Sequence, residues 1–240
     1  APASANIISK LAYGMADDML STTALSCTCK KIIAPAMNTN MYRNPIVQNN
    51  IQMLKNYGFT VIAPDTGMLA CGDIGEGKMA NEDVLMEYIL AEAAYEKDMK
   101  NLKVLVTAGP TREAIDPVRF ITNHSSGKMG YSIAKTAMLR GADVTLVTGT
   151  TSLTPPPFVE VINAVSAEDM YNAVIDRIKE QDIIIKSAAV ADYRPAKVSE
   201  EKIKKSDSDM SINLEKTKDI LKEIGQIRQK HQYICGFSME

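Results

Sequence analysis

The sequence predicts an α/β protein with two parallel-sheet domains, and three observations lead to this fold class. Short apolar runs of strand length alternate with amphipathic segments at helical spacing along the chain. A charged stretch at residues 95–100 separates two such series and is typical of a linker. Polar or glycine-rich residues follow several apolar runs, where open parallel sheets bind ligands. We therefore expect one domain at residues 1–97 and another at 98–240.

The first domain is expected to start inside a structural unit, because no strand precedes its first helix. Apolar periodicity, capping residues and glycines place the remaining boundaries. In order, we expect a helix from about residue 7, a strand at 32–34, a helix at 45–58, a strand at 60–63, a loop at 65–80 and a helix at 81–94.

The second domain repeats the alternation with longer apolar runs. Its most convincing buried strand is the run at residues 182–185. In order, we expect a strand at 104–106, a long loop, a helix at 129–138, a strand at 144–147, a loop at 154–158, a strand at 159–162, a helix at 167–179, a strand at 182–185, a helix at 216–230 and a strand at 233–237.

The connection after the strand at 104–106 is unusually long. Roughly 17 residues lie there, whereas such connections usually have about 2–6. It ends in Ser125, Ser126, Gly127 and Lys128, directly before a helix. Free N–H groups and the helix dipole would hold a phosphate there. The simpler interpretation is an ordinary N-cap formed by Ser125 or Ser126.

Composition excludes several classes of protein. The net charge is −2, Trp is absent and aromatic residues make up 5% of the chain, which argues against a nucleic-acid-binding protein. No apolar run approaches the roughly 20 residues of a membrane span. Four cysteines and two histidines lack the spacing of a zinc site. Neither G-x-G-x-x-G nor a P-loop occurs. We expect a soluble cytoplasmic protein.

The stretch TAGPTREAIDPVRFITNHSSGKMG, residues 107–130, closely resembles the signature of the phosphopantothenate–cysteine ligases. This resemblance implies a doubly wound Rossmann-like domain. In the bacterial members, CTP activates the carboxylate of 4′-phosphopantothenate as an acyl-cytidylate, which the amine of cysteine then attacks. The resemblance therefore implies CTP, cysteine and 4′-phosphopantothenate as ligands of this domain.

The ligase resemblance also assigns roles to individual residues. It implies that Lys202 forms the acyl-cytidylate and that Asn123 acts in its onward reaction, although the basic residues 200–205 would commonly be a solvated loop. Asp192 matches a nucleotide-binding residue that acts through Mg²⁺. Lys218 stands where a K-N-P-D pattern has Pro, so its match is weaker. The implied nucleotide contacts are Lys186, Ser187, Ala188, Asp192, Lys218, Asp219, Ile220, Leu221 and Phe237.

Three segments of the first domain, residues 2–6, 34–38 and 70–79, together resemble the flavin-dependent phosphopantothenoylcysteine decarboxylases. This resemblance implies a flavodoxin-like flavoprotein domain that binds FMN. Cys71 would be the catalytic acid, whereas a lone cysteine is more often a small buried apolar residue. The implied FMN contacts are Ser4, Ala5, Asn6, Ile7 and Ala36, and the implied substrate contacts are Asn38, Met68, Leu69 and Ala70.

The chain departs from both families at its ends. The decarboxylases use a His upstream of the FMN segment, and the ligases have further lysines downstream of the position matched by Phe237. We therefore expect a fragment that lacks both termini and has incomplete sites. The families also imply a homo-oligomer, with trimers through the decarboxylase half and dimers through the ligase half, which together could build a dodecamer.

The order of the two segments resembles the bifunctional bacterial enzymes of coenzyme A biosynthesis, which carry both activities. The alternative is a non-catalytic flavoprotein-like regulatory or scaffold subunit that keeps the folds without the missing catalytic pieces. A nucleotide-sugar or NAD(P) enzyme is disfavoured, because the glycine fingerprint of dinucleotide-binding domains is absent.

Overall fold

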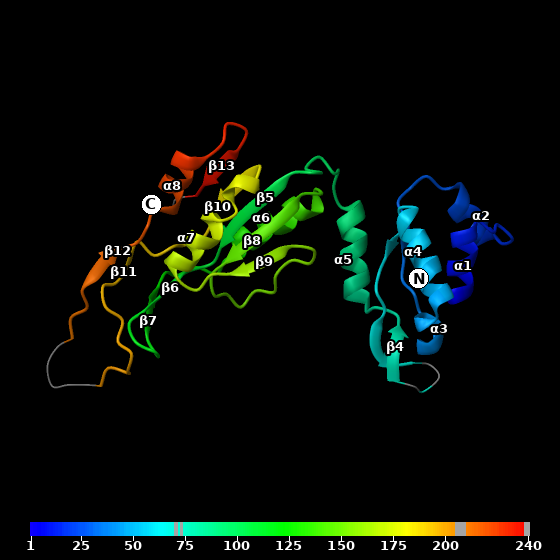
Figure 1. Ribbon diagram of the computed structural model, residues 1–240, viewed down its shortest axis with the longest axis horizontal. Coiled ribbons are helices and arrows are strands. Elements are labelled where there is room, and N and C mark those ends of the chain that lie inside the picture. Colours follow the sequence, from blue (N-terminus) through cyan, green and yellow to red (C-terminus); the bar gives the residue numbers. More distant parts are fainter. Residues whose placement is uncertain (70–71, 73, 205–209, 238–240) are drawn as a thin grey trace. The chain divides into compact units, whose positions relative to one another are not determined.

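The computed structural model describes residues 1–69, 72, 74–204 and 210–237. The chain divides into two compact units, Ala1–Ala94 and Tyr95–Glu240, here called unit 1 and unit 2 (Figure 1). Both units alternate helices with strands, and their main strand pairs are parallel. The predicted α/β fold class is confirmed.

Unit 1 packs helices against a short parallel pair of strands. Strand β1 pairs with β2, and a parallel bridge from Ala3 to Pro35 extends the pairing. Its core lies where α1 packs on α4, and the side chains of Ile8 and Leu54 are fully buried there. Its elements are α1 (Ala5–Tyr13), α2 (Met19–Ser26), β1 (Ile32–Ile33), α3 (Thr39–Arg43), α4 (Pro45–Asn56), β2 (Thr60–Val61), β3 (Asp65–Met68), β4 (Ile74–Lys78) and α5 (Glu82–Ala93).

The loop expected at residues 65–80 is wrong, because β3 and β4 form an antiparallel hairpin there. Its glycines allow close approach between backbones rather than flexibility. The N–H of Met37 donates to the carbonyl of Gly77 at 3.0 Å, and a Cβ on Gly77 would lie 2.2 Å from the Met37 carbonyl oxygen. Helices α2 and α3 were not predicted either.

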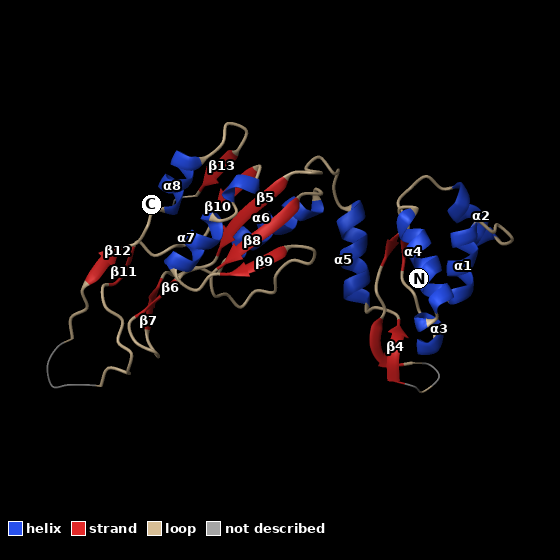
Figure 2. Cartoon of the chain, in the orientation of Figure 1, coloured by secondary structure: helices blue, strands red, loops and turns tan. Residues whose placement is uncertain are grey.

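Unit 2 is built on a five-stranded parallel sheet of order β13-β10-β5-β8-β9 (Figure 2). Its elements are β5 (Lys103–Ala108), β6 (Arg112–Ala114), β7 (Phe120–Thr122), α6 (Lys128–Leu139), β8 (Asp143–Thr148), β9 (Glu160–Asn163), α7 (Ala167–Ile175), a 3₁₀ helix (Ile178–Glu180), β10 (Ile183–Lys186), β11 (Tyr193–Pro195), β12 (Leu214–Lys216), α8 (Ile220–Ile227) and β13 (Tyr233–Gly236).

All five strands of this sheet lie where apolar runs predicted them, but three details of unit 2 differ. The long loop contains an antiparallel hairpin, β6 with β7. The helix expected at 216–230 begins only at Ile220, since Asp219 caps it and residues 214–216 form β12. The N-cap of α6 is Gly127, with φ of 76° and no side-chain cap, so Ser125 and Ser126 do not have that role.

The sheet of unit 2 has a topological switch point between β5 and β10. From β5 the chain crosses through α6 to β8 on one side, whereas β10 and β13 lie on the other side. The connections from β5 and β10 therefore lead to opposite sides of the sheet, and the carboxyl edge between these two strands, here called the crevice, is the usual ligand position in such folds. Within the described part of the chain, no helix is long and apolar enough to cross a membrane.

Candidate functional site

The loops after β5 and β10 are joined by hydrogen bonds at the carboxyl edge of the sheet. Thr107 lies beside Lys186 in the register of the two strands. The buried Thr107 hydroxyl accepts hydrogen bonds from the N–H groups of Ser187 and Ala188, both at 3.2 Å. Further along, the buried Thr111 hydroxyl accepts the N–H of Ala191 at 3.0 Å. These threonines fix the backbone of the segment predicted to line the nucleotide.

Asn123 lies against the same segment. Its side-chain amide donates to the carbonyl oxygens of Ala189 at 3.3 Å and Val190 at 3.2 Å. The preceding residue, Thr122, anchors β7 by donating to the Thr111 carbonyl at 2.7 Å. The structure therefore brings Asn123 close to the segment that leads to Asp192.

Lys186 presents a cation at this edge. Among the described residues, its ammonium group makes no hydrogen bond or ion pair. Burial lowers the pKa of Lys186 from its ordinary value, and the carboxylates of Asp219 and Asp192 oppose that shift. Nearby, the Ser187 hydroxyl is buried without a hydrogen-bond partner. The crevice thus holds a cation without a direct ion pair and a hydroxyl without a hydrogen-bond partner, which suit an anionic polar ligand.

The start of α8 and the end of β13 form the other wall of the crevice. Asp219 caps α8 by accepting the Lys222 N–H at 3.0 Å. Leu221 covers Gly236, where a Cβ would lie 2.9 Å from its Cδ2. The N–H of Phe237 donates to the Lys186 carbonyl at 3.1 Å, while the Phe237 ring is 52% exposed. Ile220 is fully buried in the core, so its side chain cannot contact a ligand at this edge.

Asp192 is exposed and connects the two walls. Its carbonyl accepts the Thr217 N–H at 2.9 Å, and the Thr217 hydroxyl donates to Ala191 at 2.6 Å. The described residues contain no group of three or more His, Cys, Asp or Glu side chains that could hold a metal ion. A nucleotide-bound Mg²⁺ needs only one or two protein carboxylates, because the phosphates supply the remaining oxygens.

Two predicted residues lie elsewhere. The Lys218 ammonium pairs with Glu168 at 2.7 Å and sits 4.4 Å from the centre of the Tyr171 ring, and the hydrogen bond with Glu168 raises the pKa of Lys218. Exposed Lys202 lies on a segment whose neighbour Ile203 is held by Asp116. No hydrogen bond or ion pair joins Lys202 to Asn123 or Asp192 among the described residues.

The residues of unit 1 that were matched to FMN lie around the start of α1. Ser4 is the exposed N-cap of this helix, and its hydroxyl accepts the Ile7 N–H at 3.4 Å. Asn6 is exposed, whereas Ala5 is buried and could offer only its backbone. The N–H of Ala36 donates to the Ala3 carbonyl at 3.0 Å, which places Ala36 beside the helix start.

The residues matched to the decarboxylase substrate lie at the start of α3 and on the hairpin of β3 and β4. Asn38 caps α3 by accepting the Asn40 N–H at 2.8 Å. The hairpin packs against the same turn, with exposed Met68 at the end of β3 and half-buried Leu69 after it. Ala70 and Cys71, predicted as a substrate contact and the catalytic acid, lie outside the described residues.

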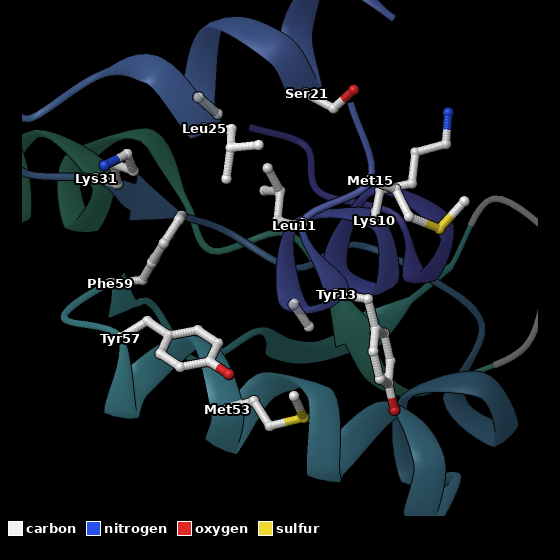
Figure 3. Close-up of a pocket in the computed structure, with 13 residues that line it drawn as sticks. Lys10, Leu11, Tyr13, Met15, Ser21, Leu25, Lys31, Met53, Tyr57 and Phe59 are labelled. Atoms are coloured by element: carbon white, nitrogen blue, oxygen red, sulfur yellow. The ribbon is translucent and has the colours of Figure 1, made fainter. Parts of the chain in front are cut away.

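An apolar pocket of about 480 Å³ lies in unit 1 between α1, α2 and α4 (Figure 3). Figure 3 shows Leu11, Leu25, Met53, Tyr57 and Phe59 around it. None of the residues matched to FMN or to the decarboxylase substrate lines this pocket. An adjoining pocket of about 320 Å³ shares Leu11 and Phe59 with it and includes Ile7, which is matched to FMN.

Sequence reasoning missed the side chains that shape the crevice from behind. Buried Thr107 and Thr111 were not singled out as such residues. Threonines that flank Gly109 and Pro110 at a strand end were the available signal, because hydroxyls in such turns commonly bond to nearby backbone.

Two protein-family models match the chain. The model of the DNA/pantothenate metabolism flavoprotein C-terminal domain matches residues 99–240, and the flavoprotein model matches residues 1–94. The chain belongs to the DNA/pantothenate metabolism flavoproteins.

Curated relatives and solved structures agree with this family. The coenzyme A biosynthesis bifunctional protein CoaBC of Bacillus subtilis (strain 168) is 47% identical over all of this chain and 60% of its own length. A cysteine/cysteine sulfinic acid decarboxylase of an unknown prokaryotic organism is 42% identical over all of this chain and 68% of its own length. A crystal structure of the C-terminal domain of a CoaBC protein is 48% identical, with a TM-score of 0.50 over 57% of this chain and 63% of that chain. The chain thus spans 60% of the length of its CoaBC relative.

Proposed function

We propose that the protein acts in coenzyme A biosynthesis. Unit 2 would ligate cysteine to 4′-phosphopantothenate with CTP, and unit 1 would take part in FMN-dependent decarboxylation of the product to 4′-phosphopantetheine. The relationship to CoaBC proteins supports both steps. The observation that carries the ligase proposal is the crevice of unit 2, where Asn123 donates to the segment after Lys186 and the lysine ammonium makes no direct ion pair among the described residues.

The ligation has two chemical steps at this edge. A carboxylate oxygen of 4′-phosphopantothenate attacks the α-phosphorus of CTP, and the bond to pyrophosphate breaks. The cysteine amine then attacks the acyl carbon, CMP leaves and the amine loses a proton. Negative charge on the phosphorus oxygens rises in the first step, so a fixed cation such as Lys186 stabilises that transition state.

Other residues of the crevice would orient the two substrates. The exposed Phe237 ring and the start of α8 suit the base and ribose of CTP. Asn123 would hold the acyl-cytidylate while the amine attacks. Asp192 would coordinate the Mg²⁺ that is bound to the triphosphate. Lys202 would bind the reacting phosphate from the segment whose backbone Asp116 holds.

The start of α1 fits FMN. Two exposed polar side chains, Ser4 and Asn6, stand at a helix N-terminus whose first N–H groups lack intrahelical acceptors. The Ser4 hydroxyl and the Asn6 amide offer hydrogen-bond donors that a phosphate or a flavin carbonyl requires, and Ala36 lies beside them. When bound, FMN supplies the oxidant for the cysteinyl thiol. Asn38 would hold the substrate, and Cys71 would donate a proton.

The oligomeric state and the cellular location of the protein are proposed from the same family relationship. We propose a cytoplasmic homo-oligomer, in which trimers form through unit 1 and dimers through unit 2. Sedimentation of the protein would show the mass of such an assembly, and a monomer would contradict it.

The ligase proposal is tested by measuring pyrophosphate release. The protein should release pyrophosphate from CTP only when 4′-phosphopantothenate is present. Lys186→Met should lower this rate by about tenfold or more, since a charge-assisted contact contributes about 1.5–3 kcal/mol. Lys230→Met is the control, because this exposed lysine precedes β13 at the opposite edge of the sheet. If the protein releases no pyrophosphate with CTP or another nucleoside triphosphate, at any concentration of 4′-phosphopantothenate, the result would favour the non-catalytic scaffold alternative.

FMN binding is tested without turnover. Adding the protein to FMN should quench flavin fluorescence, and Asn6→Ala should weaken that binding. Asn56→Ala is the control, because Asn56 ends α4. Equal binding by both variants would contradict the assignment of FMN to the start of α1.

A further inference from the structure

A polar cavity of about 440 Å³ lies at the amino edge of the sheet of unit 2, where β5, β8 and β9 begin. Every described residue that lines it is polar or charged. Strand β5 has six residues, so at about 3.3 Å per residue this cavity lies about 20 Å from the crevice at the carboxyl edge. The two are therefore separate sites.

Gln181 lines this cavity between the 3₁₀ helix and β10. This residue is only 5% exposed, and its side-chain carbonyl oxygen, Oε1, is buried without a hydrogen-bond partner among the described residues. Buried polar atoms normally have a partner, because an unpaired one has lost its water without compensation. The Gln181 oxygen therefore lacks a donor, and a ligand in the cavity can supply it.

The backbone at Gln181 is held on both sides. Its N–H donates to the Ile178 carbonyl at 3.2 Å, and its carbonyl accepts the Nε2 of buried Gln232 at 2.7 Å. The next residue, Asp182, donates its N–H to the Lys103 carbonyl at 2.9 Å and accepts the Lys103 N–H on its carboxylate at 2.8 Å. This fixed backbone limits how far the Gln181 amide can move to find another partner.

Carboxylates outnumber cations around the cavity, four to two among the lining residues. Glu180 is partly compensated by Lys103, whose ammonium lies 3.9 Å from its carboxylate. Glu160 and Asp176, which also line the cavity, make no ion pair with any described residue. The buried Thr145 hydroxyl donates to the Glu160 carboxylate at 2.9 Å and holds it in place. The cavity thus combines uncompensated negative charge with an unpaired carbonyl oxygen.

A ligand that donates hydrogen bonds and carries positive charge matches these groups. A metal ion is disfavoured, because the described residues contain no group of three or more His, Cys, Asp or Glu side chains that could hold one. An ammonium group offers three donors together with its charge. We propose that the cavity binds a small organic diamine. One ammonium group bonds to Gln181 Oε1 and Glu160, and the other is held by Asp176 at the end of α7.

Calorimetric titration with a matched series of four-carbon compounds tests this proposal. 1,4-Diaminobutane carries an ammonium group at each end, 4-aminobutanoate carries one ammonium and one carboxylate, and butanedioate carries only carboxylates. The diamine should bind most tightly, 4-aminobutanoate more weakly, and butanedioate not at all. No binding of the diamine overturns the proposal. Equal or tighter binding of 4-aminobutanoate also overturns it, because the carboxylate would then be held by Arg177, the lining cation next to Asp176.

Two variants locate the bound diamine. Gln181→Leu should lower diamine affinity about tenfold, since hydrogen bonds to charged groups are among the stronger ones. It should also raise the unfolding midpoint of the ligand-free protein, because Leu has nearly the same volume and removes the unpaired buried oxygen. Glu160→Gln, at an exposed residue, should weaken the diamine by a similar factor and serves as the test if Gln181→Leu fails to fold.

Gln226→Leu and Glu200→Gln are the matched controls, because both residues are exposed and lie outside the cavity. Both should leave the diamine affinity unchanged. Unchanged affinity in Glu160→Gln or Gln181→Leu overturns the proposal. A lower unfolding midpoint in a folded Gln181→Leu protein does so as well, because the oxygen would then already have a partner. None of these outcomes depends on the ligase activity of the crevice.

Discussion

The buried carboxylate of Asp116 accepts a hydrogen bond from the N–H of Ile203 at 3.2 Å, across 87 positions of sequence. Arg119 completes the link, since its guanidinium pairs with Asp116 and donates to the Ile203 carbonyl at 3.0 Å. The Arg119 guanidinium also holds the pKa of Asp116 well below its usual range. One ion pair therefore fixes the backbone beside Lys202.

Asp116→Asn should impair ligation more than it impairs folding. The amide keeps the shape of the side chain but loses the charge that holds Arg119 and Ile203, so the Lys202 segment loses its anchor. Misplacing a reacting group by about 1 Å can cost about a hundredfold in rate. Pyrophosphate release from CTP should fall at least tenfold. Asp143→Asn, at the amino edge of the sheet, is the control. Retention of the full rate in Asp116→Asn would show that this anchor is not needed.

Gly130→Ala should destabilise unit 2. A Cβ there would lie 2.5 Å from the Ala108 Cβ, and the helix cannot withdraw from β5 without opening the core. Overpacking of this kind costs about 1–3 kcal/mol. The matched control is Gly225→Ala in α8, where nothing lies within 4 Å of the new Cβ. That change should stabilise the helix by about 0.5–1 kcal/mol. Thermal unfolding measures both, and equal midpoints for the two variants would refute the close approach.

The central sheet was predictable because its strands are apolar runs, and such runs are stable only when they are buried in a core. Residues 104–106 are such a run and are buried in β5, whereas in β10 only Ile184 is buried and its neighbours in the strand are half-buried. The hairpin of β3 and β4 was not predictable, because Gly75 and Gly77 have no β propensity. Their strand is fixed by contacts with Met37 and Thr39, which lie more than thirty positions away.

The sequence predicted where the candidate site lies in the chain, but it did not predict which partners several of its side chains have. Polar residues after β5 and β10 indicated the crevice, and Asn123 lies there. The partners of Lys218 and Lys202 were not predictable, because Glu168 and Asp116 come from distant elements. The cap of α6 was assigned to serine by propensity, whereas the close approach of Gly109 and Thr151 requires glycine at position 127.

Lys218→Met should change CTP affinity by less than about fivefold, since surface ion pairs contribute roughly 0–1 kcal/mol. The Lys218 ammonium pairs with Glu168 and lies over the Tyr171 ring, so it does not point into the crevice. Glu168→Gln should behave in the same way. Calorimetric titration with CTP measures both variants beside Lys186→Met. A loss in Lys218→Met as large as that in Lys186→Met would show that Lys218 turns toward the nucleotide.

Lys186→Met should also alter the pH dependence of stability. Burial lowers the pKa of Lys186 below 10.5, so between that lowered pKa and 10.5 the folded protein binds fewer protons than the unfolded chain. The free energy of unfolding of the unmodified protein therefore rises with pH in this window. Lys186→Met lacks the buried cation and should be more stable at neutral pH.

The stability advantage of Lys186→Met should shrink as the pH approaches 10.5. Unfolding midpoints of both proteins, measured from neutral pH to that value, test this expectation. An advantage that is constant or grows with pH would mean that Asp192 and Asp219 compensate the buried charge fully.

Amide hydrogen exchange with and without CTP shows where on unit 2 the nucleotide binds. The account predicts slower exchange on addition of CTP at the first turn of α6 and in residues 187–192, with no change at the amino edge of the sheet around Asp143 and Glu180. Protection at that opposite edge, or no protection anywhere in unit 2, would contradict the assignment of the crevice as the nucleotide-activating centre.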